Sequence, residues 1–293
     1  MSIKIIGGQD HMLETTPQHR RWTVLGGLFF VYMASNGVTL HTLPLLYPEL
    51  MDSFGWRASE VTLPVTILFI VGAVTSPPAG WLLDRYSPRA VITIGSVLLT
   101  LGLVSYAHTQ SLWQLVAIYS LLGLALSLCG LVSNMVMLTG WFDSDRGRAT
   151  GILLMASSLG GAIFPLAVGS GIEAFGWRQT VLLAGLGVGA LMLSCAWLLL
   201  RDRNPLERLP NPHSAPSAER GTVLPLLLTR RFAAIVFATG SLWFVIMALT
   251  QHQSIHLARD VGLERSLLPT VFSLFFGSSI IGKLSFGLLA DRF

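Results

Sequence analysis

The most regular feature of the sequence is the return of long apolar stretches separated by shorter polar segments. A helix needs roughly 20 apolar residues to cross about 30 Å of hydrocarbon. Lipid cannot satisfy an open backbone, and the strand alternation of a lipid-facing barrel is absent, so helices are expected. We therefore predict an all-α polytopic membrane protein with about eight transmembrane helices, at about residues 22–46, 60–83, 90–107, 112–140, 149–171, 179–200, 232–250 and 267–290.

Two polar segments divide this pattern. Residues 1–21 are polar and end in Arg20-Arg21, which predicts a cytoplasmic N-terminal tail ahead of a retained first span. Residues 201–231 combine charges with several prolines, and proline stops a continuous helix. The expected organisation is thus a tail at 1–21, a six-helix bundle at 22–200, a cytoplasmic linker at 201–231, and the first two helices of an incomplete second bundle at 232–293.

Composition and charge placement agree with a membrane protein. The chain is 52% hydrophobic and 12% charged, about half the charged fraction of roughly 25% in globular domains. With the N-terminus in the cytoplasm, fourteen of the 19 Lys and Arg fall in inside loops, four in outside loops, and Lys283 within a span. The positive-inside rule therefore favours a cytoplasmic N-terminus. No basic face interleaved with aromatics suggests nucleic acid as a partner.

One short phrase occurs twice, as "GWLLDRY" at residues 80–86 and "GLLADRF" at residues 287–293. Both copies read Gly-x-x-x-Asp-Arg-aromatic and end an even-numbered span, the second and the eighth. A repeat that returns after six spans implies a parallel duplication of a six-helix unit. The chain is then expected to correspond to the first eight spans of a twelve-span protein.

Other stretches complete a family resemblance. "FGWR" occurs at 54–57 and at 175–178, and "WFDSDRGRATGI" joins spans four and five. With the duplicated phrase, these resemble the major facilitator superfamily. "PELMDSFGWRASEVT" (48–62) and "GKLSFGLLADRF" (282–293) are most similar to its monocarboxylate transporter and oxalate/formate exchanger-like branch. The resemblance implies a major facilitator-like fold and movement of small organic anions, with a proton or by exchange.

The repeated phrase predicts a conformational latch on the cytoplasmic side. A glycine four residues before the aspartate lets a neighbouring helix approach, and a carboxylate at the helix end can cap another helix's positive N-terminus. By symmetry, Asp291 is expected near residues 147–151 at the start of span five. The alternative is a simple interfacial charge anchor. The predicted latch residues are Gly80, Asp84, Arg85, Arg89, Gly287, Asp291 and Arg292.

Lys283 is the first candidate for substrate binding. It lies seven residues before the end of span eight, about 10 Å deep, where an ammonium could bind a carboxylate. The alternative is that its amine snorkels to the headgroups. In the resembled transporters a basic residue, usually arginine, stands four residues before the span-eight glycine, as Lys283 does before Gly287. Ser279 stands where they carry an aspartate, so acid-based proton coupling there is in doubt.

His41 is the second candidate, late in span one before Pro44. The resemblance aligns it with a lysine of animal monocarboxylate transporters, and a histidine titrates near neutral pH and could accept a coupling proton. The alternative is a capped histidine near the outer headgroups. Tyr32 and Asn36 on span one and Asn134 on span four are expected to line the cavity, although polar residues also join membrane helices to one another.

These observations predict a secondary transporter of small organic anions that works by alternating access in the plasma (inner) membrane. Proton coupling and exchange against a counter-anion both remain open. No ATP-binding loop and no catalytic motif such as His-Glu-x-x-His or Gly-x-Ser-x-Gly occurs, so neither an enzyme nor a cofactor is predicted. Cys129 and Cys195 lie in apolar spans without metal-ligand spacing. The alternatives are a facilitator for drugs or sugars, or a non-transporting fragment of such a transporter.

Overall fold

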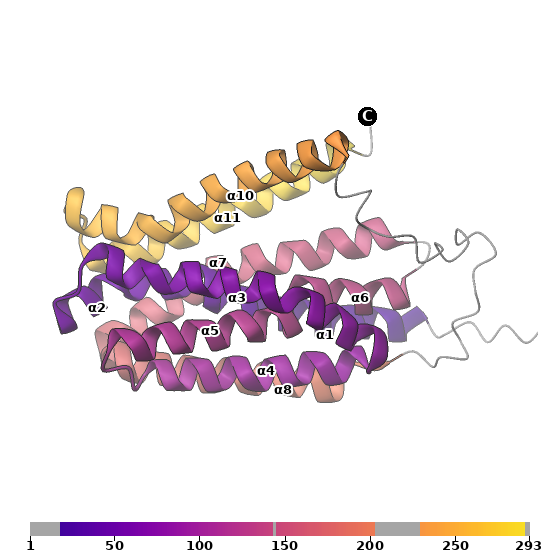
Figure 1. Ribbon diagram of the computed structural model, residues 1–293, viewed down its shortest axis with the longest axis horizontal. Helices are drawn as coiled ribbons and strands as arrows, with labels where there is room; N and C mark the ends of the chain where they lie inside the picture. The colour runs from indigo at the N-terminus through magenta and orange to yellow at the C-terminus, as the bar shows by residue number, and fades with distance from the viewer. Residues whose placement is uncertain (1–17, 143–144, 203–228, 291–293) are drawn as a thin grey trace, which may run out of the picture.

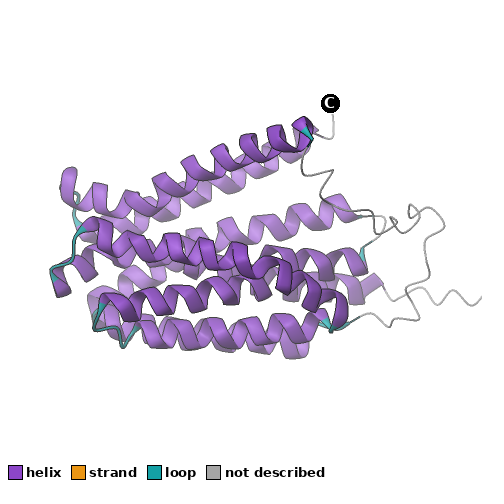
Figure 2. Cartoon of the chain, in the orientation of Figure 1, coloured by secondary structure: helices purple, strands orange, loops and turns teal. Residues whose placement is uncertain are grey.

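The structure of the chain, a computed structural model, describes residues 18–142, 145–202 and 229–290. All regular secondary structure in these ranges is helical (Figure 2). Eight stretches are long and apolar enough to cross a membrane, which confirms the predicted all-α class and the number of spans. Most of the predicted tail and most of the predicted linker lie outside the described residues, and residues 18–21 of the tail already belong to the first helix.

The first span is longer and less regular than predicted. It begins as α1 (Gln18–Asn36), continues through a π-helical turn η1 (Gly37–Thr42) and a 3₁₀ turn η2 (Leu43–Leu46), and ends as α2 (Tyr47–Phe54). The prediction that it ends near residue 46 was therefore wrong. Pro44 has no N–H to give to a regular ladder, so the helix changes its hydrogen-bond register there rather than stopping.

Five further spans complete the first bundle (Figure 1). The fourth, predicted as one run over 112–140, is broken at Gly130, whose ψ of −155° is not helical. Ser87 begins one helix by accepting from the N–H of Ala90, and Ser111 begins another through a capping box with Gln114. The elements are α3 (Ala58–Arg85), α4 (Pro88–Tyr106), α5 (Leu112–Cys129), α6 (Leu131–Trp141), α7 (Arg146–Phe175) and α8 (Trp177–Leu198).

Two spans follow the linker. The seventh is α10 (Arg230–Ile255), extended by a π-helical turn η4 (His256–Asp260), and the eighth is a 3₁₀ turn η5 (Arg265–Leu267) followed by α11 (Leu268–Ala290). The turn between them lies at the same end of the molecule as α2 (Figure 1). We call this the α2 end and the opposite end, where α1 begins, the α1 end.

Helix α7 joins the two parts of the molecule. On one side it meets the first span so closely that a Cβ atom added to Gly37 would lie 2.7 Å from the Cα of Gly160. On the other side it packs antiparallel to α11. There the ring of Pro269 covers Gly169, and the Ser273 hydroxyl donates to the Ala162 carbonyl at 2.5 Å. The same helix therefore fixes the position of both the first span and the last.

Helix α10 is held at one end only. Its buried residues are confined to the last turns, at Thr250, Gln251, Ser254 and Ile255. None of its most apolar stretch is buried, and α10 diverges from the six-helix bundle toward the α1 end (Figure 1). Aromatic side chains such as Phe237 and Phe244 are exposed along it. In a membrane, this surface is available to lipid or to further helices.

Candidate functional site

The two strongest sequence candidates meet at one segment of α7. His41 of the π-helical turn lies 3.0 Å from the hydroxyl of Ser157 through its Nε2 atom. Lys283 of α11 donates from Nζ to the hydroxyl of the next residue, Ser158, at 2.6 Å. The first and the last spans of the described chain thus place a histidine and a lysine on consecutive residues of the same helix.

Lys283 is directed toward α7. Besides Ser158, its ammonium donates to the carbonyl oxygen of Leu154 at 3.1 Å. The hydroxyl of Ser279, one turn earlier on α11, lies 3.2 Å from that of Ser158, so two serines stand beside the ammonium. Both acceptors of Lys283 are uncharged, and a carboxylate brought to this position would gain a charge-assisted hydrogen bond.

His41 is enclosed between the first span, α7 and α11. Its side chain is 8% exposed, and the ring of Phe276 lies against it with the two ring centroids 4.0 Å apart. While Nε2 contacts Ser157, the other ring nitrogen, Nδ1, is buried without a hydrogen-bond partner among the described residues. A buried polar atom without a partner carries a desolvation cost of about 1–3 kcal/mol. Such an atom is suited to a ligand that supplies the missing hydrogen bond.

The other predicted cavity residues are buried but have different surroundings. Tyr32 and Asn36 lie one turn apart at the end of α1, 6% and 9% exposed. Asn134 is fully buried, and its amide nitrogen donates to the carbonyls of Cys129 and Gly130 at 2.8 and 2.7 Å. Asn134 therefore bonds backbone carbonyls at the break in the fourth span, which is a structural role beside any contact with a ligand.

An open cavity of about 560 Å³ borders this region from the side of α10 and α11. Its wall includes Ser279, which reaches from the cavity to Ser158 and so toward Lys283. The rest of the wall is mixed, with the polar residues Gln253 and Ser278 beside apolar ones, of which Phe275 is the aromatic member. Ser279 is therefore accessible from this side.

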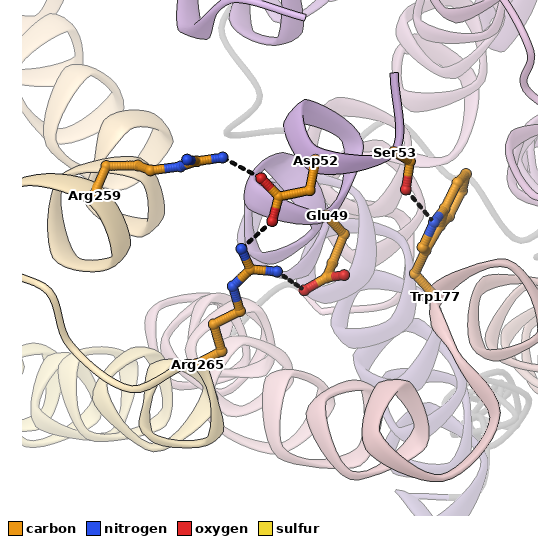
Figure 3. A network of polar contacts seen from close by, with 6 residues as sticks. All are labelled: Glu49, Asp52, Ser53, Trp177, Arg259 and Arg265. Atoms are coloured by element: carbon orange, nitrogen blue, oxygen red, sulfur yellow. Dashed lines mark hydrogen bonds and ion pairs between the residues drawn. The ribbon is translucent and has the colours of Figure 1, made fainter. Parts of the chain in front are cut away.

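At the α2 end, a network of charges joins the first bundle to the last two spans (Figure 3). Asp52 of α2 accepts hydrogen bonds from both Arg259 of η4 and Arg265 of η5. The second branch of the Arg265 guanidinium donates to Glu49 at 2.9 Å. Sequence reasoning counted these arginines as outer-loop cations and missed their partners, because more than 200 residues separate the two sides.

Beneath the charges lies a buried layer of hydrogen bonds between α10 and the irregular part of the first span. The Tyr47 hydroxyl donates to the Gln251 side chain at 2.8 Å, and the Gln251 amide donates to the carbonyl of Leu40 at 3.3 Å. The Ser254 hydroxyl donates to the carbonyl of Pro44 at 2.5 Å. The carbonyls of the π and 3₁₀ turns thus find their partners on α10, which closes the α2 end.

The predicted latch residues lie at the α1 end, as far as the structure describes them. Arg89 donates to the carbonyls of Ala196 and Trp197 at 2.9 and 2.7 Å and so caps the last turn of α8. Arg85 lies over the ring of Trp81 at 5.4 Å, and Asp84 is exposed.

Gly80 and the second copy of the repeated phrase make no described contact that tests the latch. A Cβ atom on Gly80 would meet nothing within 4 Å, so no described helix approaches that face. Of the second copy, Gly287 lies in α11, whereas Asp291 and Arg292 lie outside the described residues, as does the predicted approach of Asp291 to α7. The latch stays a prediction.

Among the described residues, no group of three or more His, Cys, Asp or Glu side chains could hold a metal ion. Both cysteines are unpaired and buried, Cys129 in α5 and Cys195 in α8. The polar groups available for recognition are therefore an ammonium, an imidazole, hydroxyls and amides. Together they can bind an anion or an uncharged hydrogen-bonding molecule without a metal.

Known proteins similar to this chain are membrane transporters. It is 29% identical over 237 residues to an MFS-type transporter of Gibberella moniliformis, covering 78% of this chain and 53% of that protein. It is 29% identical to human monocarboxylate transporter 11, covering 80% and 51%. The agnestins efflux protein of Paecilomyces divaricatus is 28% identical, covering 73% and 47%. The chain thus spans about half the length of these relatives.

The fold is also similar to that of a solved structure. A bacterial homolog of the human lysosomal transporter Spinster, in an inward-facing and unoccupied conformation, matches with a TM-score of 0.69 over 94% of this chain and 64% of that one, at 19% identity. The family model of the Major Facilitator Superfamily matches residues 24–293. Fold, span number and family model agree, and the chain belongs to the major facilitator superfamily.

Proposed function

We propose that this chain is part of a secondary transporter of small organic anions of the monocarboxylate kind. The observation that carries the proposal is the convergence of His41 and Lys283 on Ser157 and Ser158 of α7. An ammonium inside a membrane-spanning helix is costly unless it is used or neutralised, and a carboxylate neutralises it. The resemblance to monocarboxylate transporters gives independent support.

In this proposal Lys283 supplies the charge and the surrounding polar groups orient the anion. The hydroxyls of Ser158 and Ser279 can donate to the second carboxylate oxygen, while Nδ1 of His41 contacts a hydroxyl or keto group of the acid. Tyr32, Asn36 and Asn134 remain proposed lining residues. Because Ser279 replaces an acid at this position, either His41 carries a coupling proton or the transporter exchanges one anion for another.

The proposed alternating access is supported by the unequal closure of the two ends. The α2 end is closed by the Asp52 charges and by the buried hydrogen bonds of Gln251 and Ser254, whereas α10 diverges from the bundle at the α1 end (Figure 1). With the N-terminus in the cytoplasm of a plasma-membrane protein, as the charge bias favours, this is an inward-facing arrangement. The repeated Asp-Arg phrase then lies at the cytoplasmic end, where a latch would act.

A second candidate is efflux of a larger organic molecule. The chain is similar to proteins named for efflux as well as to monocarboxylate transporters, and the cavity beside Ser279 is open and partly apolar. A further alternative is that the 293-residue chain does not transport alone, since it spans about half the length of its relatives. These possibilities differ in what crosses the membrane.

Uptake of labelled acetate, lactate and oxalate into vesicles that contain the chain tests the proposal. Saturable uptake that falls with Lys283→Gln and survives with Lys283→Arg supports it. Binding of the acids without uptake would support the site but make the chain a non-transporting part. Neither binding nor uptake of any of these acids would overturn the organic-anion assignment.

A further inference from the structure

Phe276 occupies a particular place beside the candidate anion site. It stands on the α11 face that also carries Ser279 and Lys283, three and seven residues later, so these side chains lie along one stripe. At about 1.5 Å of rise per residue, the stripe is about 10 Å long. Lys283 marks its charged end and Phe276 its apolar end.

The ring of Phe276 is held in place on two sides. Its centroid lies 4.0 Å from that of His41 and it is 5% exposed. On the other side it rests on α7 at Gly161, where an added Cβ atom would lie 2.5 Å from the ring's Cγ and 2.8 Å from its Cδ2. Only a glycine leaves room for an aromatic ring in this position, so the ring of Phe276 packs directly against the backbone of Gly161.

We propose that Phe276, seated on Gly161 and packed against His41, is the specificity-determining residue that limits the size of the acid bound at Lys283. This inference rests on the proposed organic-anion function and names what sets its size range. The carboxylate is placed at Lys283 and Ser158, and the carbon chain points along the stripe toward His41. The phenyl ring closes that end and excludes acids with bulky substituents.

The chemistry of the site explains why this is more than core packing. The Nδ1 atom of His41 is buried without a partner among the described residues, so the region next to Phe276 contains a polar atom suited to a ligand. An aromatic ring over an imidazole leaves the in-plane nitrogen available. The neighbouring Phe275 differs, since it is 42% exposed and lines the open cavity instead.

The test measures equilibrium binding of acetate, butyrate and phenylacetate to the full chain in lipid nanodiscs. Removing the ring with Phe276→Ala leaves a space that the phenyl group of phenylacetate can fill, as apolar cavities bind benzene. The affinity for phenylacetate relative to acetate is expected to rise at least about tenfold, which corresponds to 1.4 kcal/mol. Phe237→Ala, which removes an exposed ring from α10, is the control and is expected to leave this ratio unchanged.

A second variant covers the case in which Phe276→Ala does not fold. Gly161→Ala pushes the ring of Phe276 away from α7 toward His41 and is expected to weaken butyrate binding more than acetate binding. Adding Phe276→Leu to Gly161→Ala is expected to restore butyrate binding. An unchanged size preference in these variants, with wild-type binding intact, would overturn the size-filter proposal alone. Failure of the wild-type chain to bind any of the three acids would overturn the organic-anion function and this inference with it.

Discussion

His41 and Lys283 contact the side chains of two consecutive residues of α7, although one belongs to the first span and the other to the eighth. The contact places a possible proton carrier and a fixed positive charge at the junction between the six-helix bundle and the last two spans. A movement of α11 relative to α7 would change both groups together. In the proposed function, the six-helix bundle and the last two spans therefore share one binding site.

The charge of Lys283 is expected to matter more than its exact shape. Lys283→Gln is expected to weaken carboxylate binding by about tenfold or more, because a hydrogen bond to a charged group contributes about 1.5–3 kcal/mol. Lys283→Arg keeps the charge and is expected to retain most of the binding, since a guanidinium can hold a carboxylate with two hydrogen bonds. Calorimetry on the purified chain measures both. Equal carboxylate affinity in the wild type and Lys283→Gln would show that the ammonium does not contribute to binding.

Two glycines of α7 offer a paired stability test. Gly160→Ala is expected to lower the free energy of unfolding by about 1–3 kcal/mol, because the added Cβ would lie 2.9 Å from the Cα of Gly37. Gly151→Ala on the same helix meets nothing within 4 Å and is expected to stabilise by about 0.5–1 kcal/mol. Thermal unfolding in detergent compares them. Equal effects would show that the first span does not pack here.

The charges at the α2 end are expected to keep it closed. Asp52→Asn weakens the acceptor shared by Arg259 and Arg265, and exposed pairs of this kind contribute up to about 1 kcal/mol each. A cysteine placed at the buried Thr250 is then expected to react with a membrane-impermeant maleimide about three- to tenfold faster. Raising the salt concentration is expected to act in the same direction.

The control for this gate experiment is Glu264→Gln. Glu264 lies at the same end, but among the described hydrogen bonds its carboxylate accepts only from Ser266, so its loss is expected to leave the labelling rate unchanged. The native cysteines, Cys129 and Cys195, are buried and add little background. A labelling rate that is the same with and without Asp52→Asn would show that the charges do not hold the α2 end closed.

Substitutions at Arg89 and Asp84, two of the predicted latch residues, are expected to have different effects on stability and on transport. Arg89→Ala is expected to lower stability by about 1 kcal/mol, because Arg89 caps the carbonyls at the end of α8. Asp84→Asn is expected to leave stability within about 0.5 kcal/mol while slowing transport, as the latch requires. A stability loss from Asp84→Asn equal to that from Arg89→Ala would contradict the latch.

Much of the architecture could be predicted from local pattern alone. The eight apolar runs are long enough to identify spans without any tertiary information, and the duplicated Asp-Arg phrase indicated the order of the bundles. Lys283 and His41 could be selected one by one, because an ionisable residue in an apolar span is unusual. That they share α7 could not be predicted, since neither Ser157 nor Ser158 differs from an ordinary helix-packing serine.

The details that failed depend on partners distant in sequence. The π and 3₁₀ turns of the first span are tolerated because Gln251 and Ser254 of α10 accommodate their carbonyls. The break at Gly130 is stabilised by the side-chain amide of Asn134, which donates to the carbonyls of Cys129 and Gly130. Hydropathy averages over such positions and predicts an unbroken helix. The Asp52 network is likewise invisible to any count of loop charges.

The most direct test of the account is a double-mutant cycle of acetate binding with His41→Gln and Lys283→Gln, measured on the full chain in nanodiscs. If both side chains act on one bound anion through α7, each single change weakens binding, and the double change costs less than the sum of the two, by about 0.5 kcal/mol or more. Strictly additive losses would contradict the shared site. Acetate affinity unaffected by either change would contradict the proposed site altogether.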